Sequence, residues 1–171
     1  ISRLNIAILD PKHTIDLPPK VTASTGMDAF THCLEAFLVN SFHPMADAIA
    51  LEGIKMIVDN LPLVLKEPSN LNSRGIMLLS ASIGATAFQK GLGAIHALSH
   101  SVGALYETHH GLTNAVFMPY VIKFNRTAVE DKLNHITKYL NLPKPGYSGL
   151  MDWVLGLRDK FKIPTSALDL G

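Results

Sequence analysis

The residues best suited to chemistry in this chain form two groups that could converge on one metal ion. In the first group, Asp28 and His32 stand four positions apart. In the second group, His96 and His100 have the same spacing, and His110 follows ten residues later. Side chains at i and i+4 lie one above the other on a helix face, so two such pairs on neighbouring helices can point at a single ion. Imidazole with one carboxylate suits divalent iron, zinc, nickel or copper.

The same side chains also have a structural interpretation. Asp28 could stabilise the N-terminal end of a helix through the helix dipole, and His32 could be an ordinary buried histidine. His96 and His100 could form a polar stripe on a packed helix. Because all of them occur at spacings that suit one ion, the metal hypothesis is favoured over independent structural roles.

Other titratable side chains are expected to support the fold. His13, His43 and His135 have no partner in the pattern, so we expect them at the surface or in loops. Glu35 lies one turn beyond the first pair and is expected to orient a ligand or to pair helices, not to bind the ion itself. Cys33 is expected to be an inert, buried thiol.

The size and composition of the chain are those of one globular domain. Its 171 residues are 47% hydrophobic, and the mean hydropathy is +0.21, which allows a sizeable core. The formal net charge of +1, without a basic block, argues against a nucleic-acid-binding surface. The longest apolar stretches, residues 76–89 and 91–106, are shorter than the roughly 20 residues of a membrane span. A single cysteine excludes an internal disulfide and fits the reducing cytoplasm.

Helical patterns dominate the chain after residue 21. Ser24 or Thr25 can cap a helix that ends near Val39, and Pro44 suits the first turn of the next helix. Proline lacks a backbone N–H, so Pro62 and Pro68 are expected to break or kink the stretch that follows. Further helices are expected over residues 70–88, 94–106, 111–124, 128–140 and 148–162.

The first residues of the chain have the pattern of a strand, whereas the rest of the chain has helical patterns. Residues 5–9 read NIAIL and are followed by Asp10-Pro11, a pattern that predicts a short strand. A strand without a neighbour is not stable, so its partners are expected in another part of a larger protein. The predicted fold is therefore all-α, a helical bundle with a short leftover N-terminal strand.

Two segments resemble the metal-binding motifs of the iron-containing alcohol dehydrogenases. Residues 23–37 read ASTGMDAFTHCLEAF and are similar to the first motif of that family. Residues 91–114 read GLGAIHALSHSVGALYETHHGLTN and are similar to the second. The resemblance covers about residues 4–125, and two separated motifs with matching internal spacing make it a specific signal.

The resemblance implies a division into domains. The family combines an N-terminal α/β half that binds NAD(P) with a C-terminal all-helical half that holds the metal, an architecture shared with dehydroquinate synthase-like enzymes. Residues 1–21 would then be the last strand and linker of a missing nucleotide-binding domain. Residues 22–171 would be the all-helical metal-binding domain, incomplete at its C-terminus. Consistent with this division, the chain has no G-G-G-S-like nucleotide loop.

The resemblance also implies roles for individual side chains. The metal ligands would be Asp28, His32, His96 and His110. Spacing alone nominates the pair His96 and His100, whereas the family pattern places His100 near the substrate. There it could be a catalytic residue that relays the proton of the alcohol, because histidine titrates near neutral pH. Pro11 matches a cofactor-binding position near the nucleotide.

The activity implied by the family is hydride transfer between a small alcohol or aldehyde and NAD or NADP. Fe²⁺ is the expected ion and Zn²⁺ the alternative, and the ion would act as a Lewis acid on the alcohol. Apolar residues that could line the substrate pocket are Phe30, Leu98, Val102 and Phe117. The metal-binding half alone is expected to be inactive. We expect a cytoplasmic homo-oligomer with neither nucleic-acid nor membrane partners.

Two other classes of function remain as alternatives. A metal-dependent lyase or hydrolase could use a related helical scaffold, although dehydroquinate synthase-like relatives hold zinc with fewer histidines. The pattern of one aspartate and three histidines favours the dehydrogenase. The chain could also be a non-catalytic metal-binding or oligomerisation module. Metal-dependent turnover without a nucleotide would indicate the lyase or hydrolase.

Overall fold

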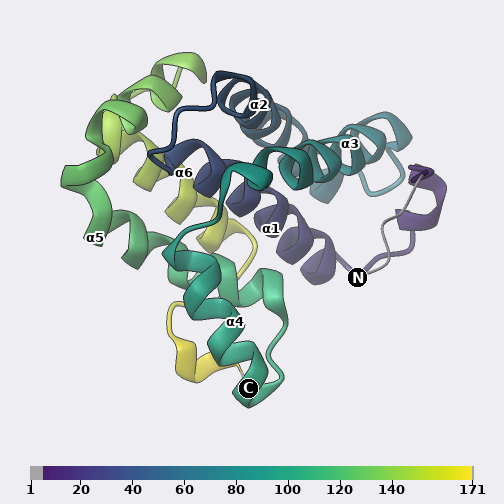
Figure 1. The fold of residues 1–171 in the computed structure, drawn as a ribbon. Coiled ribbons are helices and arrows are strands. Elements are labelled where there is room, and N and C mark those ends of the chain that lie inside the picture. Colours follow the sequence, from purple (N-terminus) through teal and green to yellow (C-terminus); the bar gives the residue numbers. More distant parts are fainter. Residues whose placement is uncertain (1–5, 171) are drawn as a thin grey trace.

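The computed structural model describes residues 6–170, and this part of the chain folds as a bundle of helices without a strand (Figure 1). The α-helices are α1 (Pro19–Leu38), α2 (Pro44–Lys66), α3 (Leu71–Ala87), α4 (Ala94–Tyr106), α5 (His110–Tyr139) and α6 (Gly146–Lys160). Short 3-10 helices are η1 (Pro11–Thr14), η2 (Phe88–Lys90) and η3 (Ala167–Leu170). The all-α prediction is confirmed for the described residues.

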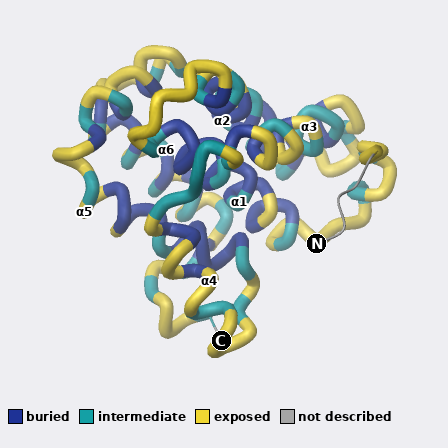
Figure 2. The backbone as a smooth tube through the Cα atoms, viewed as in Figure 1, coloured by how far each residue is buried: buried dark blue, intermediate teal, exposed yellow. Residues whose placement is uncertain are grey.

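Helix α1 forms the centre of the bundle. It packs against α2, α3 and α5, and α6 packs against α5. A helix enclosed on several sides must be apolar around most of its circumference, and most residues of α1 are buried (Figure 2). Phe30, Leu34 and Met27 of α1 are among the largest fully buried side chains. Helix α1 is therefore a fixed platform for any polar side chains that it carries.

Helix α4 lies at the edge of the bundle, where it packs against α5 (Figure 1). Its boundaries agree with the prediction, and Glu107 ends it in the left-handed conformation. Glycine allows α5 to approach α1 closely at the start of α5. A Cβ added to Gly111 would lie 2.4 Å from the carbonyl oxygen of Ser24. Two of the helices that carry predicted ligands, α1 and α5, therefore meet at backbone distance.

The predicted start of the first helix is wrong. Helix α1 begins at Pro19, five residues before Ser24, because proline suits the first turn of a helix. The hydroxyls of Ser24 and Thr25 do not cap this helix; they donate to the carbonyls of Lys20 and Val21 one turn earlier. Side-chain capping does occur at α3, where Asn70 Oδ1 accepts a hydrogen bond from the amide of Ser73.

Two expected breaks in the helices are absent. Helix α2 continues past Pro62 to Lys66 and ends two residues before Pro68, so only the second of these prolines follows a helix end as expected. Helix α5 is continuous from His110 to Tyr139, where two helices separated near residues 125–127 were predicted. Residues 125–127 read NRT and contain neither glycine nor proline, so nothing local ends the helix there.

The predicted strand lies partly outside the described residues, because Asn5 is not among them. Ile6–Leu9 have no regular secondary structure. A strand needs a neighbour for its backbone hydrogen bonds, and the described part of the chain offers no other extended segment. The division at residue 21 stays a prediction. None of the described helices is long and apolar enough to cross a membrane.

Candidate metal centre

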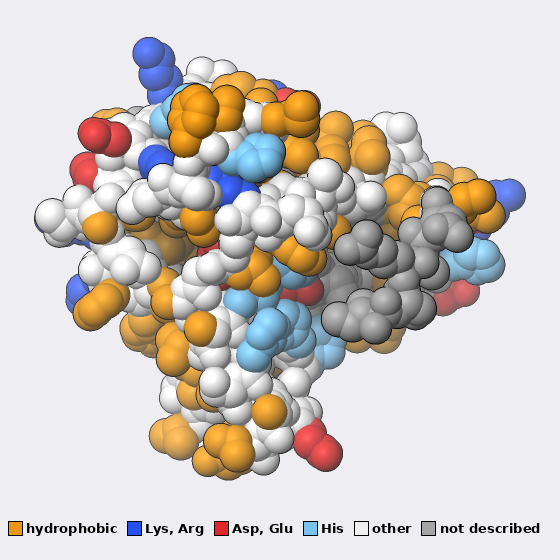
Figure 3. Space-filling view, in the orientation of Figure 1, with side chains coloured by type: hydrophobic (Ala, Val, Ile, Leu, Met, Phe, Trp, Pro, Cys, Tyr) orange, Lys and Arg blue, Asp and Glu red, His pale blue; other side chains and the backbone are white. Residues whose placement is uncertain are grey.

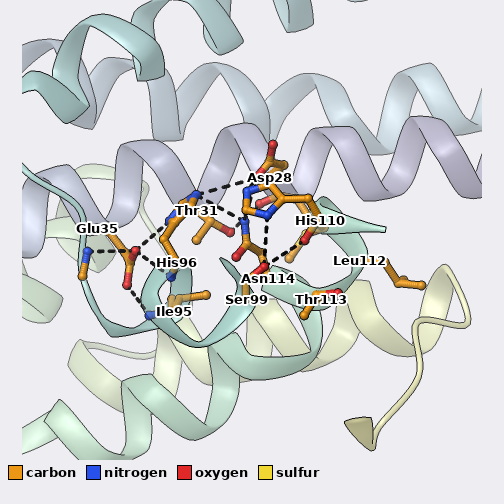
Figure 4. A network of polar contacts seen from close by, with 12 residues as sticks. Asp28, Thr31, Glu35, Ile95, His96, Ser99, His110, Leu112, Thr113 and Asn114 are labelled. Carbon is orange, nitrogen blue, oxygen red and sulfur yellow. Dashed lines mark hydrogen bonds and ion pairs between the residues drawn. The ribbon is translucent and has the colours of Figure 1, made fainter. Parts of the chain in front are cut away.

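Three helices bring the four predicted ligands together. Asp28 and His32 project from α1, His96 from the first turn of α4, and His110 is the first residue of α5. One ligand atom from each of these side chains lies within 4.8 Å of the others. Figure 3 shows histidine side chains gathered over α4, and Figure 4 shows Asp28, His96 and His110 pointing toward one another.

Short distances connect the carboxylate to two of the imidazoles. Asp28 Oδ1 lies 3.4 Å from His110 Nε2 and 3.8 Å from His96 Nε2. Both separations exceed ordinary hydrogen-bond lengths, and they suit two ligands of one ion better than a direct bond between them. The His32 ring stacks on the His96 ring, with 4.6 Å between centroids and 17° between planes.

The site is closed at one end and open at the other. The side chain of His96 is 2% exposed, whereas that of His110 is 39% exposed. His100 is exposed and stacks on His110, with ring centroids 5.0 Å apart. A small molecule would therefore reach the centre from the side of His100 and His110.

The two adjacent histidines at the start of α5 have different roles. His109 is the N-cap of the helix, where its Nδ1 accepts a hydrogen bond from the amide of Leu112. His110 turns toward the centre, and its Nδ1 lies 3.1 Å from Ser99 Oγ. Ser99 also donates to the carbonyl oxygen of His110. With its Nδ1 side engaged by Ser99, His110 presents Nε2 to the other ligands.

Glu35 contacts the buried end of the centre. The residue is 3% exposed, and its Oε2 lies 2.7 Å from His96 Nδ1. This contact fits the predicted supporting role of Glu35. An acceptor at Nδ1 favours the tautomer that carries its proton there, which leaves the lone pair of Nε2 free for an ion.

Asn114 was not predicted to take part, yet it touches three of the four ligands. Its Nδ2 lies 2.7 Å from Asp28 Oδ1 and 3.2 Å from Nε2 of both His96 and His110. The residue is fully buried, and its Oδ1 has no hydrogen-bond partner. The one available signal was position, because Asn114 lies four residues after His110 on the same helix face. Ser99 was also missed, because serine is a common residue and nothing in its spacing marked it as a partner of His110.

The charges of the centre favour a cation. Burial opposes ionisation of Asp28, but the hydrogen bonds and charges of its neighbours outweigh burial and lower its pKa. Burial lowers the pKa of His32 and of His110, and the charge of Asp28 only partly compensates. Asp28 is therefore anionic and these two imidazoles are neutral near pH 7, which is the form in which they bind metals.

His96 behaves differently from the other two imidazoles. Burial opposes its protonation, but Asp28 and Glu35 outweigh burial and raise its pKa to about 9. A proton therefore occupies a place that a cation would take, and binding of an ion must release it. Three imidazole nitrogens and one carboxylate oxygen form a donor set that fits divalent iron or zinc.

Other predicted site residues lie elsewhere or serve the core. Phe30 is fully buried and packs on Trp153, with ring centroids 4.7 Å apart, so it does not line a substrate pocket. Pro11 begins η1, which packs against α3, whereas the ligands lie on α1, α4 and α5. Leu98 of α4 is 44% exposed and is accessible to a ligand.

The remaining titratable groups mostly follow the predictions. Burial raises the pKa of the Cys33 thiol to about 12, so this cysteine is inert near neutral pH. His13, His43 and His135 are exposed. His43 accepts a hydrogen bond from the amide of Ala46 and so caps α2.

Comparison with known proteins supports what the motifs indicated. Residues 22–171 match the model of the Fe-containing alcohol dehydrogenase family, C-terminal. The chain belongs to the iron-containing alcohol dehydrogenase family. It is 40% identical to 4-hydroxybutyrate dehydrogenase of Cupriavidus necator over 146 residues, which cover 80% of this chain and 38% of that protein. It is 35% identical to NAD-dependent methanol dehydrogenase of Bacillus methanolicus, over 84% of this chain and 38% of that protein.

Solved structures of the family have the same fold. The iron-containing alcohol dehydrogenase of Thermococcus thioreducens matches 92% of this chain with a TM-score of 0.83 and 31% sequence identity. The match covers 41% of that chain. The present chain therefore corresponds to the C-terminal helical part of an iron-containing alcohol dehydrogenase, and it spans about two fifths of the length of these relatives.

Proposed function

We propose that this chain is the metal-binding part of an NAD(P)-dependent alcohol dehydrogenase that uses Fe²⁺, with Zn²⁺ as the alternative ion. The observation that carries the proposal is the convergence of Asp28, His32, His96 and His110 within 4.8 Å from three helices. The three nitrogen donors and one oxygen donor suit either ion. When bound, the ion would supply Lewis-acid activation of an alcohol or aldehyde oxygen.

The chain's own residues would prepare the reaction in three ways. Glu35 orients the ring of His96, and Ser99 orients the ring of His110. His100 stands at the open side, stacked on His110, where it can exchange a proton between the alcohol and solvent. Leu98 and the half-buried Val102 and Phe117 could contact a short aliphatic chain.

The nucleotide and its half of the site would come from outside this chain. Pro11 in η1 would contact the nucleotide, and the choice between NAD and NADP would depend on that other half. The named relatives support a small alcohol or aldehyde as substrate, since they include a methanol dehydrogenase and a 4-hydroxybutyrate dehydrogenase. We also propose a homo-oligomer in the cytoplasm, without nucleic-acid or membrane partners.

Metal content tests this function first. The 171-residue chain, purified without oxygen, should retain about one iron or zinc per chain, measured by elemental analysis. His110→Ala should lose the ion, because it removes one of the four donors, while the exposed His135→Ala should keep it. Absence of metal from the wild-type chain, even after iron and zinc are supplied, would contradict the proposed centre.

Activity separates the dehydrogenase from its alternatives. A protein that joins this chain to a family nucleotide-binding half should oxidise short alcohols with NAD or NADP, and the chain alone should not. Turnover by the chain alone, with metal but no nucleotide, would indicate a lyase or hydrolase. If the joined protein binds metal but has no activity, the chain is a non-catalytic metal-binding module.

A further inference from the structure

Helix α4 begins at a carboxylate that belongs to another helix. Glu35 of α1 accepts hydrogen bonds from three backbone amides at the start of α4, those of Gly93, Ile95 and His96. The distances to its oxygens are 3.0, 2.7 and 3.3 Å. The N-cap position of α4 is Gly93, which has no side chain to satisfy these amides. Glu35 therefore takes the place of the missing cap.

The same carboxylate also holds a proposed metal ligand. Glu35 Oε2 lies 2.7 Å from His96 Nδ1, so one oxygen serves both a backbone cap and an imidazole. The helix dipole adds to the effect, because a negative charge at the N-terminus of a helix is stabilising. Three backbone amides and Nδ1 of His96 lie within hydrogen-bond distance of the two oxygens of Glu35, an arrangement that suits a carboxylate.

From these contacts we infer that Glu35 is a positioning residue that couples the docking of α4 to the orientation of His96. The start of α4 and the direction of the His96 ring depend on one buried anion. If that anion moves, the amides at the start of the helix and the ring lose their acceptor together. The part of the inference that concerns the metal rests on the proposed function; the capping of α4 does not.

Gly93 offers independent support, because the carboxylate fills the space where its side chain would be. A Cβ added to Gly93 would lie 2.7 Å from Glu35 Oε1. The backbone angles of Gly93 are open to any residue, with φ −116° and ψ −156°. Space for Glu35, and not backbone strain, therefore explains the glycine. Gly93→Ala should push the carboxylate away without altering the carboxylate itself.

Glu35→Gln tests the charge and the second acceptor oxygen of Glu35 without changing the size of the side chain. Both carboxylate oxygens accept hydrogen bonds, Oε1 from Ile95 and Oε2 from His96 and Gly93. An amide has only one oxygen, so in either orientation its NH₂ group faces a donor. The substitution keeps the volume of the side chain and removes the charge and one acceptor.

Zinc titration of the 171-residue chain measures the effect on the centre. Glu35→Gln and Gly93→Ala should weaken Zn²⁺ binding about 10- to 100-fold, the usual range for a group that orients a metal ligand. Glu52→Gln is the matched control, since Glu52 is exposed and bonds only Tyr139 at the surface. Circular dichroism confirms that each variant is helical. Wild-type zinc affinity in folded Glu35→Gln would overturn the metal part of the inference.

Hydrogen exchange tests the cap without metal. In the presence of a chelator, Glu35→Ala should accelerate exchange of the Ile95 and His96 amides, and leave amides in the middle of α5 unchanged. If the wild-type chain binds no zinc but this acceleration occurs, the proposed function fails and the capping role stands. If exchange at Ile95 and His96 is as slow in Glu35→Ala as in the wild type, the inference is wrong.

Discussion

Asn114 Nδ2 donates a hydrogen bond to Asp28 Oδ1 at 2.7 Å, although 86 residues separate them. The same nitrogen contacts Nε2 of His96 and of His110. This amide donor thus lies between the Asp28 carboxylate and Nε2 of the neutral His110, whose lone pairs would otherwise face each other. In the metal-free chain this donor connects Asp28 of α1 to His110 of α5.

Replacing Asn114 by leucine removes that donor at similar volume. Asp28 and His110 would lose a hydrogen-bond donor, so the free energy of unfolding of the metal-free chain should fall by about 1–3 kcal/mol. Urea denaturation with a chelator present measures this change. Asn72→Leu, on the exposed face of α3, is the control and should change stability by less than about 0.5 kcal/mol. Equal losses in both variants would contradict a special role for Asn114.

The raised pKa of His96 predicts how stability depends on pH. A histidine titrates near pH 6.5 in an unfolded chain, and His96 titrates at about 9 in the folded one. The folded state therefore holds a proton more tightly. Its contribution to stability is complete below about pH 6.5 and is lost as pH rises to about 9. Urea denaturation of the metal-free chain should show this decline between pH 6.5 and 9.

A variant isolates the His96 contribution from those of other groups. His32 and His110 have lowered pKa values, so their protonation destabilises the fold only as pH falls below about 6.5. The Cys33 thiol, with its pKa raised to about 12, reduces stability mainly above pH 8.5. His96→Gln should flatten the profile between pH 6.5 and 8.5. An unchanged slope in this variant would assign the decline to another residue.

Gly111→Ala tests the close approach of α5 to α1. The new Cβ would lie 2.4 Å from the backbone oxygen of Ser24, which cannot move away as a side chain could. We expect a loss of about 1–3 kcal/mol in the free energy of unfolding, as in other overpacked sites. Zinc affinity should fall as well, since His110 precedes this glycine.

Gly156→Ala is the matched control for this contact. No atom lies within 4 Å of the Cβ position at Gly156, which is inside α6. Alanine favours a helix over glycine, so this variant should be more stable by about 0.5–1 kcal/mol. Thermal denaturation compares the two, and a destabilised Gly156→Ala with an unaffected Gly111→Ala would refute the packing argument.

Lys132 closes the C-terminal end of α1. Its Nζ donates to the carbonyl oxygens of Phe37 and Val39 at 2.9 and 2.6 Å, and to that of Leu38 at 3.2 Å. A cation bonded to the last carbonyls of a helix satisfies them and interacts favourably with its dipole.

Lys132→Met keeps the length of the side chain and removes its charge. We expect the free energy of unfolding to fall by about 1–2 kcal/mol. For a chain of this size each kcal/mol lowers the melting temperature by about 2–4 °C. Differential scanning calorimetry measures the shift, with the exposed Lys138→Met as control. Identical melting temperatures for these two variants would show that the cap does not stabilise α1.

The sequence by itself determined the helical class, most helix boundaries and the family. The helical patterns predicted over residues 70–88 and 94–106 placed α3 and α4 within one residue of their observed limits. These signals are local, because a helix repeats every 3.6 residues and its ends need particular side chains. The resemblance of two segments to motifs of the family nominated Asp28, His32, His96 and His110 as ligands.

The tertiary structure decided which side chains meet. Residue spacing favoured His96 with His100, yet the rings that gather around Asp28 include His110, from the next helix. The partners of Glu35 lie 58 to 61 residues away, and Asn114 gave no signal except its place on a helix face. Such contacts depend on how closely the helices pack. Gly93 and Gly111 permit this close packing, and no local sequence pattern encodes it.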